Sequence, residues 1–261
     1  MRYAKLHERL ASLGVERIND LGNLAVPIRE AVDEVDRHAK YYDVIEKVCK
    51  RLAEIVERSV REGALPIVLG GDHSVAMGTL DGLTRARGSA PGVVWIDAHS
   101  DINDPEHSPS GNVHGMPLWF ALRSGFADPK RTVQIGLRDV DPLEKENLRR
   151  SGVPAFTMSD VDRLGMTKVM QDAIGIAGSG GPIHVSFDMD GIDPSEAPGT
   201  GTPVKGGLSY REAHLAMEML AESGKLGSIE MVEVNPILDT RNQTAVLAVG
   251  LICSALGKSI L

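Results

Sequence analysis

Cysteine, long apolar runs and excess positive charge are scarce or absent in this sequence, and each absence excludes a class of protein. The two cysteines, Cys49 and Cys253, lie far apart in predicted helices, so we expect two buried thiols in a reducing cytosol rather than a disulfide framework. No apolar stretch approaches membrane-spanning length, and the opening Met1–Lys5 begins no signal peptide. The net charge of −8 argues against nucleic acid or an anionic membrane as the main partner. We therefore expect a cytoplasmic protein that binds neither.

Five continuous apolar runs, rich in β-branched residues, alternate with helical patterns along the chain. The predicted strands are Leu65–Leu69, Gly92–Asp97, Thr132–Leu137, Pro182–Asp188 and Ser228–Val234. Continuous apolar strands are typical of a parallel sheet whose two faces are both covered by helices. With 261 residues and 42% apolar content, the chain is long enough for one large domain. The sequence therefore predicts a single α/β domain.

The predicted helices surround these strands in the sequence. They span Tyr3–Leu13, Tyr41–Glu62, Ser74–Arg87, Pro142–Ser151, Gly165–Ala177, Ser209–Glu222 and Gln243–Leu256. Only a weak strand, Leu21–Val26, is predicted between the first two helices. The two longest loops, 102–113 and 192–207, are rich in proline, serine and glycine. Loops of that length in a compact domain are usually functional.

Acidic residues and histidines follow the predicted strands where they end. Asp97, His99 and Asp101 occupy alternate positions directly after the second strand, so in an extended segment their side chains point the same way. Asp188 and Asp190 repeat this spacing after the fourth strand. Because ligands bind beyond the carboxyl ends of the strands in a parallel sheet, we expect one shared site there.

Together with His73, which follows the first strand, these residues form a candidate metal site. Carboxylates and imidazoles without a nearby thiol favour a hard or borderline cation such as Mn²⁺ over a structural zinc. Two divalent cations would neutralise the clustered carboxylates and would generate a bridging hydroxide at neutral pH. Any one aspartate is more simply explained as the cap of a turn, but that explanation is poor for all six residues at matching strand ends.

Three sequence blocks, Gly70–Ser74, Asp97–Asn103 and Ser186–Pro194, resemble the signature blocks of the ureohydrolases. This family contains arginases, agmatinases and formimidoylglutamases, and the blocks occur here in the family's order and spacing. The resemblance implies a three-layer α/β/α fold with a mostly parallel central sheet, formed by a single ureohydrolase domain over residues 1–261. It also implies two Mn²⁺ ions per subunit and a homotrimer or homohexamer.

The resemblance distributes the metal ligands between two ions. It implies that His73 and Asp101 bind one manganese, that His99 and Asp190 bind the other, and that Asp97 and Asp188 bridge both together with a hydroxide. Asp101 would also orient that hydroxide. Asp193 resembles the family's structural aspartate and is expected outside the metal shell.

The loop that follows Asp101 resembles the arginase version of the family. The resemblance implies that Asn103, Ser108 and Ser110 bind the α-carboxylate of L-arginine, and that Asp141, assisted by Asn112 and Glu144, binds its α-ammonium. Hydroxyl and amide donors suit a carboxylate, and agmatine, which lacks one, would leave them unpaired. For either serine alone, simple solubility of the loop would be a sufficient explanation.

Two further residues resemble catalytic groups of the family. Glu233 resembles the carboxylate that pairs with the guanidinium, and burial of a carboxylate without a cation would be costly. His114 resembles the proton shuttle to the leaving amine, and its place in this loop favours that role over the alternative of a free surface histidine. Thr202 resembles a residue near the guanidinium. The predicted reaction, catalysed with Asp101, is hydrolysis of L-arginine to L-ornithine and urea, a step of arginine metabolism and of the urea cycle.

The sequence departs from this resemblance before its first helix. Family members normally begin with a strand that lies inside the sheet, and its absence is expected to expose backbone groups or to force neighbours to re-pair. The stretch Leu118–Thr132 is also shorter than usual. Two alternatives follow: an agmatinase or other guanidino-acid ureohydrolase, distinguished by its substrate preference, and an inactive metal-binding subunit, distinguished by the absence of turnover.

Overall fold

One six-stranded, fully parallel sheet forms the centre of the protein in a computed structural model, which describes residues 1–258 apart from the side chain of Glu30. The strands are β1 (Ile67–Leu69), β2 (Gly92–Ile96), β3 (Thr132–Leu137), β4 (Ala155–Thr157), β5 (Ile183–Asp188) and β6 (Leu226–Val232). Their order across the sheet is β1-β6-β5-β2-β3-β4, and every neighbouring pair is parallel. The predicted α/β fold with a parallel central sheet is therefore confirmed.

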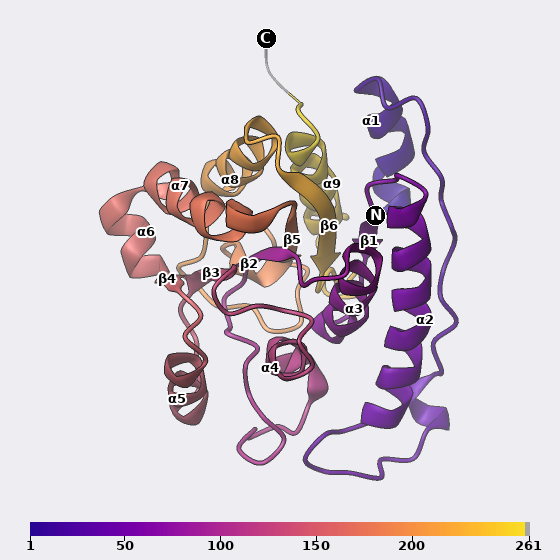
Figure 1. Ribbon diagram of the computed structural model, residues 1–261, viewed down its shortest axis with the longest axis vertical. Coiled ribbons are helices and arrows are strands. Elements are labelled where there is room, and N and C mark those ends of the chain that lie inside the picture. The colour runs from indigo at the N-terminus through magenta and orange to yellow at the C-terminus, as the bar shows by residue number, and fades with distance from the viewer. Residues whose placement is uncertain (259–261) are drawn as a thin grey trace.

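Helices cover both faces of this sheet (Figure 1). They are α1 (Leu6–Ser12), α2 (Tyr42–Arg61), α3 (Ala76–Arg87), α4 (Pro117–Arg123), α5 (Pro142–Ser151), α6 (Met158–Leu164), α7 (Met166–Ala177), α8 (Tyr210–Glu222) and α9 (Gln243–Ala255). One face packs against α7, α8 and α9, and the other packs against α3 and α4. Helix α2 forms an outer layer against α3. Within residues 1–258, no helix combines the length and apolar character that crossing a membrane requires.

Strand β2 shows why the central strands are continuously apolar. All five of its residues are buried. Val94 and Ile96 belong to the core that contains α7, α8 and α9, whereas Val93 and Trp95 pack against α3 and α4. Because successive side chains in a strand point to opposite faces, a strand covered on both sides needs an apolar residue at every position.

Most predicted elements are confirmed to within two or three residues at each end. Strand Thr132–Leu137 and helix Pro142–Ser151 have the predicted limits. Strand β4 and helices α4 and α6 were not predicted, since each has at most seven residues. Short elements of this kind depend on tertiary packing more than on a periodic pattern.

The predicted strand Leu21–Val26 is wrong. Residues 15–28 form no helix or strand, and Leu21 and Val26 are 55% and 62% exposed. Strand β1 forms an edge of the sheet and, within residues 1–258, pairs only with β6, so residues 15–28 have no strand partner in the sheet. The side of β1 that faces away from β6 therefore has no strand neighbour among residues 1–258.

Candidate active site

The six predicted metal ligands converge at the carboxyl ends of neighbouring strands. They follow β1, β2 and β5: His73 begins the short helix η3 (His73–Val75), Asp97, His99 and Asp101 follow β2, and Asp188 and Asp190 stand at the end of β5 and in η6 (Met189–Gly191). Strands β2 and β5 are direct neighbours in the sheet. The alternate spacing along two strands therefore becomes a single cluster in space.

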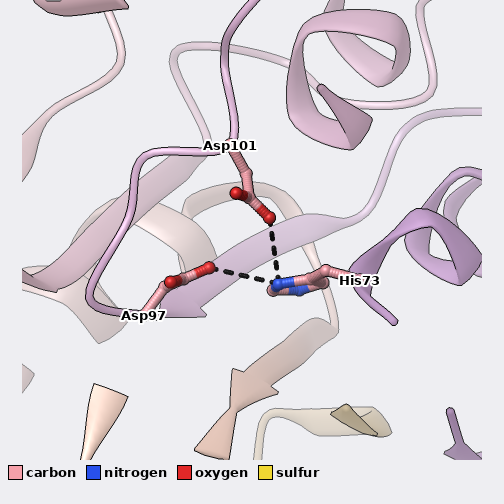
Figure 2. A group of neighbouring side chains, drawn as sticks. All are labelled: His73, Asp97 and Asp101. Atoms are coloured by element: carbon pink, nitrogen blue, oxygen red, sulfur yellow. Dashed lines mark ion pairs between the residues drawn. The ribbon is translucent and has the colours of Figure 1, made fainter. Parts of the chain in front are cut away.

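The ligand atoms of the cluster form two groups of three that share Asp97. In the first group, His73 Nδ1 lies 3.1 Å from Asp97 Oδ2 and 3.1 Å from Asp101 Oδ2, with both carboxylates aimed at the imidazole (Figure 2). In the second, His99 Nδ1 lies 3.1 Å from Asp190 Oδ2 and 3.6 Å from Asp97 Oδ1. One residue shared by two such groups is the arrangement that a pair of adjacent cations requires.

Asp188 lies between the two groups. Its Oδ2 is 3.2 Å from His73 Nδ1, and its Oδ1 accepts the backbone N–H of Asp190 at 2.7 Å. This position fits a carboxylate that contacts both ions.

Burial and mutual repulsion dominate the electrostatics of this cluster. Burial, assisted by the charge of Asp97, raises the pKa of Asp101 well above its usual range, and burial with the charge of Asp190 does the same to the pKa of Asp188. Burial alone would lower the pKa of His99, but its bonds to Asp190 and Asp97 raise that pKa to about 12. Without bound cations, these carboxylates would have to take up protons to reduce their repulsion. The cluster therefore favours the binding of cations.

The backbone at two predicted catalytic positions is left-handed. Asp101 has φ 53° and Glu233 has φ 61°, values that are uncommon for residues other than glycine. Tertiary hydrogen bonds hold both conformations: the Asp101 carbonyl accepts the N–H of Leu118 at 3.0 Å, and the Glu233 N–H donates to the Gly71 carbonyl at 2.8 Å. Conformations of this kind cost about 1–3 kcal/mol and concentrate at functional sites.

Trp95 supports two of the metal ligands from within the core. Its ring stacks on the His73 imidazole at a centroid distance of 4.1 Å and an interplanar angle of 11°, and its indole N–H donates to Asp97 Oδ2 at 2.9 Å. Sequence reasoning read this residue only as part of an apolar strand. The available signal was its place two residues before Asp97, on the same side of the strand.

A second support reaches His73 through two buried polar residues. The Ser186 hydroxyl lies 2.8 Å from His73 Nε2 and donates to Glu230 Oε1 at 2.9 Å, and the Thr79 hydroxyl bonds the other oxygen of Glu230. Because this series of hydrogen bonds engages Nε2 of His73, its Nδ1 is left to face the carboxylates. No role was assigned from the sequence to Ser186 or Glu230, although each is a polar residue in a predicted buried strand, and such residues need a partner when they are buried.

A cavity of about 290 Å³ is lined by five of the six candidate metal ligands, all except Asp97. It brings together most of the residues predicted to contact substrate: Asn103, Ser110, Asn112, His114, Asp141, Glu144, Thr202 and Glu233. Ser108 is not in the cavity wall. Its Oγ accepts the Gly111 N–H at 3.1 Å within the loop.

Two carboxylates of the cavity wall, Glu233 and Glu144, have raised pKa values. Burial raises the pKa of Glu233 to about 7, reinforced by the charge of Asp72, while the Glu233 Oε1 accepts the His73 N–H at 3.0 Å. Burial also raises the pKa of Glu144 to about 7. In such a cavity, a substrate with positive charge at both ends would relieve the desolvation of both carboxylates.

Helix α5 places Glu144 in the cavity wall, where this residue also bonds to the start of the loop 102–113. Glu144 accepts the backbone N–H groups of Ile102 at 3.1 Å and Asp141 at 3.2 Å. The Asn103 amide donates to Asp141 Oδ2 at 3.2 Å. Polar groups at the start of this helix therefore set the position of the loop.

Asp193 and His184 bond to partners outside the candidate metal cluster. Asp193 accepts hydrogen bonds from Ser195, Gly206 and Gly207, which is a structural role in its turn. His184 is fully buried and its Nδ1 lies 3.0 Å from Ser228 Oγ. Cys49 and Cys253 are free and buried, as predicted.

Comparison with known proteins identifies close relatives along the whole chain. The Arginase family model matches residues 2–257. The chain is 46% identical over 275 residues to an arginase of Bacillus caldovelox, an alignment that covers 100% of this chain and 91% of the relative. The solved structure of native Bacillus caldovelox arginase has a TM-score of 0.95 at 44% identity and the same coverage. Entamoeba histolytica arginase in complex with L-ornithine has a TM-score of 0.83 at 32% identity, covering 91% of this chain and 84% of that one.

Proposed function

The chain belongs to the arginase family, and from that premise we propose that it hydrolyses L-arginine to L-ornithine and urea with two Mn²⁺ ions per chain. The observation that carries the proposal is the pair of ligand groups sharing Asp97, set at the base of an acidic cavity. A metal pair with an adjacent site for a cationic substrate suits hydrolysis of a guanidinium group.

The residues present fit two divalent cations. His73 Nδ1 and Asp101 Oδ2 are buried without a hydrogen-bond partner, and a bound cation would satisfy both. We assign His73 and Asp101 to one manganese, His99 and Asp190 to the other, and Asp97 and Asp188 to both. The donor set has oxygen and imidazole nitrogen but no thiol, which favours manganese. When bound, the metals supply Lewis-acid activation of water at neutral pH.

We place the guanidinium of L-arginine against Glu233. This half-buried carboxylate lines the cavity, and the structure describes no ion pair for it among residues 1–258. The amino-acid end would then lie near Asp141 and Glu144, whose negative charges suit the α-ammonium. Asn103 and Ser110 would donate to the α-carboxylate.

Ser108 keeps a supporting role in this proposal. Its oxygen accepts the Gly111 N–H, so its own hydroxyl proton is free to be donated to the substrate carboxylate. Asn112 lines the cavity beside His114 and would complete the ammonium site with Asp141.

The chemical step needs a nucleophilic oxygen and a protonated leaving group. Asp101 would orient the attacking water and accept its proton, while Glu233 and Thr202 hold the guanidinium. Attack on the guanidinium carbon forms a tetrahedral intermediate. Cleavage of the bond between this carbon and the nitrogen on the δ-carbon of the substrate then yields urea. His114, in the cavity wall, would deliver the proton to the δ-amine of ornithine.

The test is urea release by purified protein preloaded with Mn²⁺, with L-arginine and agmatine compared before and after chelation. Metal-dependent urea from L-arginine, with little from agmatine, is the expected result. A preference for agmatine would contradict the assignment of Asn103, Ser110 and Asp141 to the amino-acid end. A folded protein that releases urea from neither substrate would contradict the proposed activity.

We further propose that residues 1–261 act as one domain in a cytoplasmic homotrimer or homohexamer. The single sheet of residues 1–258 supports the first part, and two free buried thiols favour a reducing compartment. Sedimentation equilibrium measures the assembly directly. A monomer would contradict the proposed oligomer.

A further inference from the structure

Arg138 lies directly after β3, beside the candidate metal ligands, and its guanidinium bonds to backbone rather than to carboxylates. Its Nη2 donates to the carbonyls of Asp190 at 2.5 Å and Val204 at 2.7 Å, and its Nη1 donates to those of Gly191 and Gly136, both at 3.2 Å. None of the ion pairs described for residues 1–258 includes Arg138. The planar five-donor fork of arginine can serve several carbonyls at once, which a lysine ammonium cannot do with the same geometry.

The backbone of this residue adds a third attachment. The Arg138 and Asp139 N–H groups both donate to the Ala98 carbonyl, at 2.9 and 3.1 Å. Ala98 lies between Asp97 and His99. A single residue therefore connects the segments that follow β2 and β5 with the distant loop at Val204.

These segments carry side chains that meet at the second group of metal ligands. Asp190 Oδ2 lies 3.1 Å from His99 Nδ1 and accepts the Thr202 hydroxyl at 2.9 Å. Thr202 stands two residues before Val204, so the guanidinium bonds to the backbone close to both partners of this contact. Movement of the segment after β2 or of the segment after β5 would separate His99 from Asp190.

We propose that Arg138 is a positioning residue that holds Asp190 and Thr202 in register with His99, so that the Asp97–His99–Asp190 group keeps its metal-binding geometry. The proposal rests on the proposed metal function of that group. It assigns the effect to the fork of hydrogen bonds and not to positive charge near the carboxylates. Arg138→Lys separates the two, because it keeps the charge and removes the fork.

Arg131 provides a matched control. Its guanidinium also donates to backbone carbonyls, those of Ala90 at 3.1 Å and Ala177 at 3.2 Å, but it precedes β3 at the opposite end of the sheet. Arg131→Lys should therefore reproduce the general loss of packing without altering the metal site. Both variants and the unaltered protein are stripped with chelator and titrated with Mn²⁺ by calorimetry, and amide exchange of residues 199–207 is followed by mass spectrometry.

For Arg138→Lys we expect at least about tenfold weaker binding of one of the two Mn²⁺ equivalents and faster exchange of residues 199–207. Arg131→Lys should leave both quantities unchanged. Unchanged metal affinity or unchanged exchange in Arg138→Lys would overturn the proposal, and so would equal losses in the two variants. If Arg138→Lys does not fold, Arg138→Gln is compared in the same way, and failure of both to fold would show a purely structural role.

Failure of the proposed function and failure of the proposed role of Arg138 can be distinguished by experiments on the unaltered protein. Unaltered protein that binds two Mn²⁺ but releases no urea from L-arginine contradicts the proposed activity alone. Unaltered protein that binds no Mn²⁺ overturns the role of Arg138 in metal binding.

Discussion

Individual residues at the site combine two demands, a left-handed backbone and an ionisable side chain. Asp101 and Glu233 both have positive φ, and each is held by a hydrogen bond to a neighbouring segment. Asparagine and aspartate tolerate this conformation better than most residues because their short polar side chains bond locally. The choice of residue at position 101 therefore serves both local conformation and metal chemistry.

Replacing Asp101 by asparagine should keep the fold and remove the chemistry. We expect Asp101→Asn to lower kcat/KM for L-arginine by at least about 100-fold, because the side chain loses its basic oxygen and one metal ligand. Asp101→Ala should unfold more easily than Asp101→Asn by about 1 kcal/mol, because alanine is less stable in the left-handed region. Urea release and denaturant unfolding measure the two effects. Equal stability of the two variants would contradict the strain argument.

Glu144 should make the stability of the chelated protein depend on pH. Burial raises the pKa of this carboxyl from 4.5 to about 7, so between these values the folded state binds more protons than the unfolded state. The contribution of Glu144 is therefore complete below pH about 4.5 and is lost as the pH rises toward 7, a change of about 3 kcal/mol at most.

Glu144→Gln removes the titration and keeps one acceptor oxygen in place of two, so it can accept only one of the N–H groups of Ile102 and Asp141. Denaturant unfolding of chelated protein at several pH values measures the free energy of unfolding. Between pH about 4.5 and 7 this free energy should decline less steeply in the variant. The same slope in both proteins would rule out Glu144 as its source.

At the scale of elements, helix α3 occupies the space between the sheet and α2. Two of its residues, Gly78 and Gly82, face the backbone of α2 so closely that an added Cβ would lie 2.6 Å from the Cys49 carbonyl oxygen and 2.5 Å from that of Ala53. The absence of side chains at these two positions permits the close approach of the helices. His73 is in the turn that leads into α3, so this packing also positions the metal site.

Substituting these glycines by alanine should destabilise the protein although alanine is the better helix former. We expect Gly78→Ala and Gly82→Ala each to lower the free energy of unfolding by about 1–3 kcal/mol, since the helices must separate. Gly175→Ala in α7 is the control, because its added Cβ meets nothing within 4 Å and should stabilise by about 0.5–1 kcal/mol. Thermal and denaturant unfolding give the comparison. Stabilisation at position 78 or 82 would show that α2 moves freely.

On the scale of the whole molecule, the sheet delivers four buried carboxylates to one edge. Their mutual repulsion opposes folding unless cations or protons neutralise it. A different feature distinguishes β1, which has a strand neighbour on one side only within residues 1–258. It lies near the exposed segment that contains Leu21 and Val26. The charged edge is thus where bound metal can contribute most to the stability of the fold.

Removal of metal should lower the stability of the entire protein. Chelation is expected to reduce Tm, and free Mn²⁺ at one hundred times its Kd should restore about 3 kcal/mol per independent site. Asp97→Asn should lose most of this response, because Asp97 belongs to both ligand groups. Calorimetric melting with and without Mn²⁺ tests the expectation. An unchanged Tm on chelation would contradict a metal-stabilised fold.

The sequence by itself determined the parallel α/β fold and the six candidate ligands. Continuous apolar strands predict a covered parallel sheet, and i, i+2 spacing places Asp97 and His99 on one side of one strand end and Asp188 and Asp190 on one side of another. These patterns are local in the sequence, so they can be recognised without knowing which segments are neighbours in space.

Only the tertiary structure decided how closely the ligand groups lie and what supports them. The His73 N–H bonds to Glu233, 160 positions away, because the order β1-β6-β5-β2 brings their segments together. The support of His73 by Trp95 and Ser186, the carbonyl contacts of Arg138, and the position of Ser108 outside the cavity wall have the same origin. Such contacts depend on strand order and loop path, and no periodicity in the sequence specifies either.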